Sequence, residues 1–211
     1  MPVISPSVTP TSTNPHEYRQ QLERITPFAS RVQIDLMDGV FASPESIRLG
    51  DVWLPENIET DIHLMYSNPL DSVEALIRLR PSLIIVHAEA NGDLLRTIDI
   101  IKGNGIRAGV ALLQDTKVET VRHLLDALDH VLIFAGSLGT FGGVADLQQL
   151  AKVQQIRSIK NNIEIGWDGG ANATNVKELA DAGIDVINVG AGISRSEHPA
   201  KSYEQLSHLV S

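Results

Sequence analysis

The chain has no cysteine among its 211 residues. A disulfide framework, a thiolate nucleophile and a metal site with cysteine ligands are therefore excluded. Basic residues are also few: 17 lysines and arginines stand against 26 aspartates and glutamates, and the formal net charge is -9. Because no basic run offsets this charge, we expect neither a nucleic acid nor an anionic membrane as the main partner. An anionic ligand would have to be held locally.

Long apolar runs are missing as well. No stretch of about 18 uninterrupted apolar residues, the length that spans a membrane as a helix, occurs in the sequence. The first residues, MPVISPSVTPTSTNP, have neither the basic nor the apolar region of a secretory signal. We therefore expect a soluble, cytoplasmic protein. Its length and its 43% hydrophobic residues suffice for one substantial core, so residues 1–211 are expected to form a single domain.

What the sequence does contain is a regular alternation of short apolar runs and helical patterns. The candidate strands, rich in β-branched residues, are 3–7, 31–37, 61–66, 82–89, 106–113, 130–136, 162–170 and 185–192. Apolar residues recur at helical spacing in 70–79, 94–102, 118–128, 147–160 and 176–182. Such alternation is typical of parallel strands joined by right-handed crossovers, and eight units predict a closed (β/α)8 TIM barrel of the α/β class. An open doubly wound sheet is the alternative, but no glycine-rich turn follows the first strand, and no nucleotide cofactor is expected.

Several candidate strands carry polar side chains opposite their apolar face. In RVQIDLM, an apolar face alternates with one formed by Gln33, Asp35 and Met37. The same parity in other strands turns further groups to that face, namely His63, Met65, His87 and Asp168. Burying an unpaired carboxylate is costly, and the chemistry of such barrels gathers at the carboxyl ends of the strands. We therefore predict that Asp35, His63 and Asp168 meet at one end of the barrel. The remaining histidines are expected on helices or loops, without a role: His16, His123, His130, His198 and His208.

The same segments carry a family resemblance. In order, and over nearly the whole chain, ISPS, VQIDLMDGVF, DIHLMYSNP, IIVHAE, FGG and WDGG resemble the motifs of the ribulose-phosphate 3-epimerases. The resemblance implies a barrel of the ribulose-phosphate-binding type and an isomerase that interconverts ribulose 5-phosphate and xylulose 5-phosphate. It assigns to Asp35 and Asp168 the family's two proton-transfer carboxylates. Inverting a carbinol centre requires such a pair, because one face loses a proton and the other face gains one.

The resemblance also implies a metal site and a substrate site. The family commonly holds a divalent ion, such as Zn, Fe or Mn, and its ligand positions correspond to Gln33, Asp35, His63 and Asp168. Gln33 stands where the family has a histidine, and an amide is a weaker ligand for such an ion than an imidazole. The implied substrate-binding residues are Ser7, Met37, Met65, His87, Gly142, Gly143, Gly169, Gly170, Gly190, Ala191 and Gly192. The glycines follow the last three strands, where backbone N–H groups can hold a phosphate.

Further departures from the family pattern lie in the same region. Phe134 replaces a methionine, Ala191 replaces a serine, and segments 112–116 and 136–143 differ from the family's turn and phosphate loop. Two alternatives therefore stay open: a non-catalytic sugar-phosphate-binding protein, and an epimerase for another ketose phosphate. A Schiff-base aldolase is disfavoured, because no lysine ends a predicted strand. A small sugar phosphate is the expected partner, and the sequence leaves a homo-oligomer open.

Overall fold

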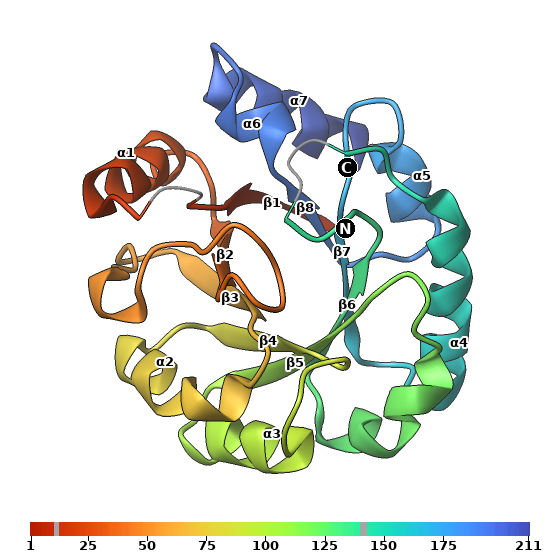
Figure 1. Cartoon of the computed structure of the whole chain (residues 1–211). Helices are drawn as coiled ribbons and strands as arrows, with labels where there is room; N and C mark the ends of the chain where they lie inside the picture. Colours follow the sequence, from red (N-terminus) through yellow and green to blue (C-terminus); the bar gives the residue numbers. More distant parts are fainter. Residues whose placement is uncertain (11–12, 140–142) are drawn as a thin grey trace.

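The computed structural model describes residues 1–10, 13–139 and 143–211, so the predicted substrate contact at Gly142 lies outside the described residues. Within these ranges, eight parallel strands pair in chain order and close into a barrel (Figure 1). The strands are β1 (Val3–Val8), β2 (Arg31–Met37), β3 (Glu59–Met65), β4 (Leu83–His87), β5 (Arg107–Leu112), β6 (His130–Phe134), β7 (Glu164–Asp168) and β8 (Val186–Val189). The predicted (β/α)8 TIM barrel is confirmed.

Helices cover the outside of the barrel (Figure 1). The α-helices are α1 (Pro15–Ile25), α2 (Val73–Leu79), α3 (Leu94–Gly103), α4 (Ala151–Ile159), α5 (Val176–Asp181), α6 (Ala191–Ser194) and α7 (Pro199–Leu209). Short 3-10 helices are η1 (Leu49–Asp51), η2 (Pro69–Asp71), η3 (Val118–Ala127) and η4 (Leu147–Leu150). All five predicted helical segments are present, although η3 is a 3-10 helix. Helices α1 and α7 were not predicted: α1 buries Tyr18, Leu22 and Ile25, whereas α7 buries one residue, too few for a clear apolar stripe.

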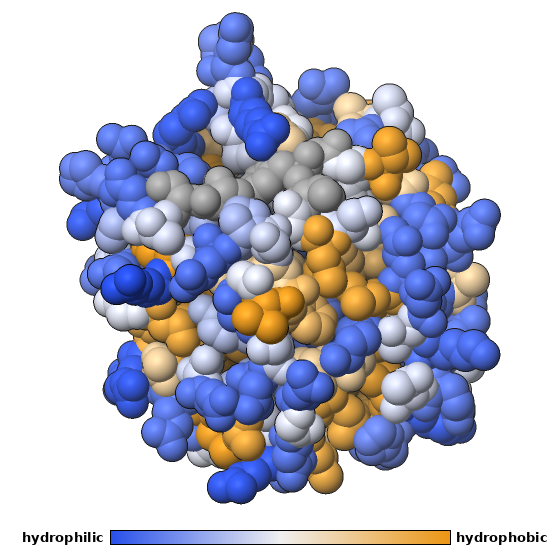
Figure 2. Space-filling model, in the orientation of Figure 1, coloured by the Kyte–Doolittle hydropathy of each residue, from blue (hydrophilic) through white to orange (hydrophobic). Residues whose placement is uncertain are grey.

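The strands separate two kinds of interior. Outward-facing side chains such as Val32, Ile34 and Leu36 pack against the helices in the main core. The lumen holds a small apolar cluster of Leu83, Ile85, Ala111 and Leu132. Hydrophilic residues cover most of the periphery (Figure 2), as expected where amphipathic helices face solvent. Among the described residues, no helix is both long and apolar enough to cross a membrane.

A charged cluster closes the amino-terminal end of the lumen. Arg31 Nε donates to Asp61 Oδ2 at 2.6 Å, and its other two nitrogens donate to the Glu164 carboxylate at 3.0 and 2.9 Å. Arg107 donates to Glu164 at 2.7 Å, and His130 Nδ1 lies 2.7 Å from the same oxygen. His130 is thus a buried strand residue of the lumen, and its expected place on a helix or loop is corrected. This cluster was not predicted, because inward polar residues were considered only at the carboxyl ends of the strands.

Glu164 makes the stability of the fold depend on pH. Burial alone would raise its pKa, but hydrogen bonds from His130 and Arg31, together with their charges, hold the pKa well below its ordinary value of 4.5. A carboxyl group whose pKa is lower in the folded than in the unfolded protein stabilises the fold at pH values above its unfolded pKa. This contribution is lost as the pH falls toward the folded pKa. We expect the free energy of unfolding to decrease between about pH 5 and pH 3, and Glu164→Gln to flatten this decrease. Urea unfolding across the pH range measures both; identical acid limbs in the two proteins would assign the effect to other carboxyls.

Candidate active site

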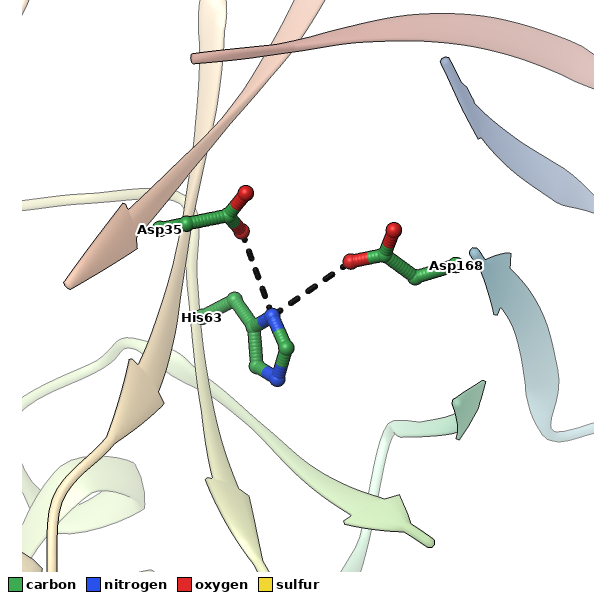
Figure 3. Close-up of side chains that lie close together, drawn as sticks. All are labelled: Asp35, His63 and Asp168. Atoms are coloured by element: carbon green, nitrogen blue, oxygen red, sulfur yellow. Dashed lines mark hydrogen bonds and ion pairs between the residues drawn. The ribbon is translucent and has the colours of Figure 1, made fainter. Parts of the chain in front are cut away.

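Three side chains converge at the carboxyl ends of the strands, as the strand parity predicted. Asp35 comes from β2, His63 from β3 and Asp168 from β7, and the two carboxylates point toward one another across the lumen (Figure 3). His63 Nδ1 lies between them, 3.2 Å from Asp35 Oδ1 and 3.4 Å from Asp168 Oδ2. The register explains part of this arrangement, because Asp35 and His63 are direct partners in the β2–β3 pair.

The two carboxylates favour the protonated form of His63 when no ion is bound between them. Its complete burial would lower the pKa, but hydrogen bonds to Asp168 and Asp35, together with the two charges, raise it to about 9. His63 Nε2 lies 2.9 Å from His87 Nε2. Burial lowers the pKa of His87 to about 4, so a neutral His87 accepts the proton of His63 Nε2. Nδ1 of His87 then donates to Glu89 Oε2 at 3.2 Å, which extends the hydrogen-bond chain away from the carboxylates.

Gln33 lies between the same two carboxylates. Its Nε2 donates to Asp35 Oδ1 at 2.8 Å and to Asp168 Oδ2 at 2.6 Å. Its Oε1 is buried and has no hydrogen-bond partner within the described part of the chain. Turning the amide over would lose these two hydrogen bonds and place the amide oxygen against the negative charge of the carboxylate pair, so that charge favours the observed orientation.

The carboxylates and His63 form a candidate metal site. One ligand atom from each of Asp35, His63 and Asp168 lies within 4.8 Å of the other two. Imidazole and carboxylate ligands suit ions such as Zn, Fe or Mn, and three protein ligands with an open position are typical of catalytic sites. Gln33 does not complete the expected four-ligand set, since it turns N–H donors rather than its oxygen toward the site. Three ligands are thus available, but the Gln33 N–H groups already bond to the carboxylate oxygens that an ion would need.

A pocket of about 250 Å³ opens over this cluster. The residues predicted from the sequence that line it are Ser7, Asp35, Met37, Met65, Gly143, Asp168, Gly169, Gly170, Gly190, Ala191 and Gly192. Gln33, His63 and His87 lie behind this lining and are fully buried. His87 contacts His63 through Nε2, so its effect on a ligand in the pocket would be indirect.

Other lining residues were not predicted. Thr9 Oγ1 donates to Asp35 Oδ2 at 2.5 Å, which fixes the second oxygen of that carboxylate. Asn188 on β8 is buried, and its Oδ1 has no partner among the residues that the structure describes. The parity of its strand could have indicated Asn188, because it shares the inward face with Gly190. Thr9 follows the end of β1, where no strand period applies. The rest of the unpredicted lining is Phe134, Gly136, Ser137, Gly139, Ala171 and Asn172.

The glycines of the pocket are of two kinds. Gly169 and Gly170 have φ angles of 113° and 69°, and a Cβ on either would lie 2.2 Å from a backbone nitrogen of a neighbouring loop. The backbone therefore requires these two glycines whatever the pocket binds. Gly190 has a negative φ of -83°, and a Cβ there would meet Oγ of Ser7, another residue of the pocket lining, at 3.1 Å. The absence of a side chain at Gly190 therefore leaves more room in the pocket.

Two of the departures from the family pattern have structural partners beside the pocket. Gln114, in segment 112–116, donates through Nε2 to the carbonyls of Ala135 and Gly136, at 2.9 and 3.0 Å. The ring of Phe134 packs 5.8 Å from that of His63 and 5.9 Å from that of His87. Gln114 therefore fixes the backbone just after β6. Phe134 packs against the two imidazole rings.

Comparison with known proteins agrees with this arrangement. Residues 3–194 match the Ribulose-phosphate 3 epimerase family. The chain belongs to the ribulose-phosphate 3-epimerase family. The family match thus covers the residues that form the closed barrel, and it includes the two facing aspartates Asp35 and Asp168.

Individual relatives support the same assignment. Ribulose-phosphate 3-epimerase from Helicobacter pylori (strain J99) is 30% identical over 191 residues, which cover 86% of this chain and 87% of the relative. The Bacillus subtilis (strain 168) enzyme of that name is 29% identical over 189 residues, covering 84% and 86%. Among solved structures, 3-hexulose-6-phosphate synthase from Salmonella typhimurium has a TM-score of 0.72 at 15% identity, covering 99% of this chain and 98% of that one. At this identity, the structural likeness shows the barrel fold alone.

Proposed function

We propose that this chain is an isomerase that interconverts ribulose 5-phosphate and xylulose 5-phosphate by transferring protons at C3. The observation that carries the proposal is the pair Asp35 and Asp168, whose carboxylates face one another and line the same pocket. One carboxylate takes the C3 proton, and the electrons of the C–H bond form the C2–C3 double bond of an enediolate. The other, protonated carboxyl returns a proton to the opposite face of C3, and the C2 carbonyl is restored. The two carboxyls have then exchanged protonation states.

The surrounding groups orient this pair. Gln33 and the His63 imidazolium place N–H donors against Asp35 Oδ1 and Asp168 Oδ2, and Thr9 holds the second oxygen of Asp35. A divalent ion held by Asp35, a neutral His63 and Asp168 in place of these donors would supply positive charge to the enediolate as a Lewis acid. The donors on the chain itself keep the carboxylates turned toward the pocket.

The phosphate is proposed to lie on the loops after β7 and β8. The first N–H groups of a helix have no partner within the helix, and α6 begins at Ala191 beside the pocket. Gly169 and Gly170 line the same side and let the backbone approach an anion closely. A local grip of this kind suits a chain with a net charge of -9, because its overall field does not attract phosphate.

Gly190→Leu tests the phosphate position. A leucine side chain would extend past Ser7 into the pocket, so affinity for ribulose 5-phosphate should fall about 10- to 100-fold, the range expected for overpacking. The melting temperature is measured in parallel to show that the variant still folds, because a Cβ at this position already meets Ser7 Oγ at 3.1 Å. Gly50→Leu is the matched control, since Gly50 is exposed and a Cβ there would have no neighbour within 4 Å. Titration calorimetry measures the affinities; an unchanged affinity in Gly190→Leu would place the phosphate elsewhere.

The proposed reaction is tested by incubating the protein with ribulose 5-phosphate in deuterated water and following C3 by NMR. Deuterium at C3 together with formation of xylulose 5-phosphate supports the proposal. Binding of the sugar phosphate without deuterium incorporation would favour the non-catalytic alternative. Incorporation into another ketose phosphate, but not into ribulose 5-phosphate, would assign a different substrate to the same carboxylate pair.

A further inference from the structure

Gln33 turns its N–H groups toward the site, and a metal ligand would turn its oxygen there instead. The structure assigns it a positioning role: we propose that the Gln33 amide, and not a metal ion, holds the Asp35 and Asp168 carboxylates facing each other. The inference deepens the proposed function and rests on it, because the proposed function gives the carboxylate pair its role in proton transfer.

The hydrogen-bond geometry carries the first step. The two N–H groups of Gln33 Nε2 reach different carboxylates, at 2.8 Å for Asp35 Oδ1 and 2.6 Å for Asp168 Oδ2. His63 Nδ1 approaches the same two oxygens, at 3.2 and 3.4 Å. Donors and acceptors thus alternate around a closed ring of four side chains. An ion bound to these oxygens would occupy the position that the amide protons fill.

The charges give the second step. One carboxylate oxygen of Asp35 lies within 4.8 Å of one of Asp168. When both groups are ionised they repel each other, and a group between them must offset that repulsion. Hydrogen bonds to a charged acceptor are stronger than neutral ones, and Gln33 contributes two of them. For Gln33 to act as a ligand instead, its amide would have to turn over, and both of these bonds would be lost.

The burial of Gln33 gives the third step. Gln33 is fully buried on β2, where it pairs in register with Ser7 of β1. Its own strand also carries Asp35, so the donor and the first acceptor share one rigid element. A buried amide on a strand that is paired on both sides keeps its position without a bound ion. The carboxylate pair is therefore preorganised by the chain itself.

The test uses the full chain after dialysis against a chelator, with Mn²⁺ as the probe ion. Wild type, Gln33→Leu and Gln33→His are compared by metal content, melting temperature and deuterium incorporation. We expect dialysed wild type to be free of metal, to keep its exchange rate within about twofold, and to gain no melting temperature from Mn²⁺. Gln33→His supplies a fourth ligand and should retain about one ion per chain, with a melting temperature that rises when Mn²⁺ is added. Gln154→Leu and Gln154→His, on the exposed face of α4, are the matched controls.

Gln33→Leu removes both donors without adding a ligand. Its exchange rate should fall at least about tenfold, in kcat more than in KM, and Mn²⁺ should not restore it. In Gln33→His the rate should depend on Mn²⁺, which a purely structural role of the amide would not predict. Should Gln33→Leu fail to fold, dialysed wild type and Gln33→His still decide the matter.

The outcomes separate the two proposals. Wild type that retains about one ion per chain through dialysis, or that loses exchange on chelation and regains it with Mn²⁺, would overturn the role of Gln33. Metal-free wild type beside metal-loaded Gln33→His supports that role even without any turnover. If none of the proteins incorporates deuterium in any metal state, the proposed epimerase function fails, while metal content and melting temperature still report on Gln33.

Discussion

Asp168→Asn should slow the interconversion of ribulose 5-phosphate and xylulose 5-phosphate by about 10²- to 10⁴-fold, the usual contribution of a general acid or base. Asparagine keeps the shape of the side chain but neither takes nor returns a proton at C3. Asp35→Asn should have an effect of the same size. The remaining carboxylate in each variant can still remove and return a proton on its own face. Each variant should therefore incorporate deuterium without inversion into one sugar, and the two variants should do so with opposite sugars.

NMR in deuterated water follows exchange and inversion in one sample. Asp99→Asn is the control, because Asp99 is an exposed carboxylate on α3, outside the pocket lining. Calorimetry shows whether the sugar phosphate still binds to each variant. If either single variant inverted C3 at nearly the wild-type rate, the two-carboxylate mechanism would be wrong.

Arg31→Met should lower the free energy of unfolding by about 3–5 kcal/mol, the range measured when one partner of a buried ion pair is removed. The Arg31 side chain is 4% exposed and that of its partner Asp61 is 2% exposed. Methionine fills much of the same volume but leaves the Asp61 carboxylate buried without its donor. Urea unfolding at neutral pH measures the loss.

Two further variants show whether burial is the cause. Arg31→Met combined with Asp61→Asn should recover part of the stability, because no uncompensated charge stays at that place in the lumen. Arg19→Met removes an exposed ion pair with Glu23 and a cation–π contact with Trp53, and together these should cost less than about 2 kcal/mol. Equal losses in Arg31→Met and Arg19→Met would mean that the charged cluster contributes no more than a surface pair.

The barrel and the position of its site were readable from local patterns. Alternation with a period of two residues separates Val32 and Ile34 from Gln33 and Asp35 wherever the strand lies in the fold. Because parallel strands in a barrel end at the same rim, inward polar residues on different strands had to meet there. This reasoning placed Asp35, His63 and Asp168 together, and the family motifs assigned their roles. It missed Thr9, which lies beyond the end of a strand, and α7, whose apolar stripe is thin.

The direction of the Gln33 amide was decided by tertiary structure alone. From the sequence, Gln33 was a weakened metal ligand at an inward position. Its Nε2 turns toward the carboxylates because one of them, Asp168, arrives from a strand 135 residues further along the chain. The buried pair of Arg31 and Asp61 was missed because it lies at the amino-terminal end of the lumen, away from the rim where polar side chains were sought. A strand pattern fixes the face on which a side chain lies, whereas the atom it presents there depends on the charges that other strands bring to it.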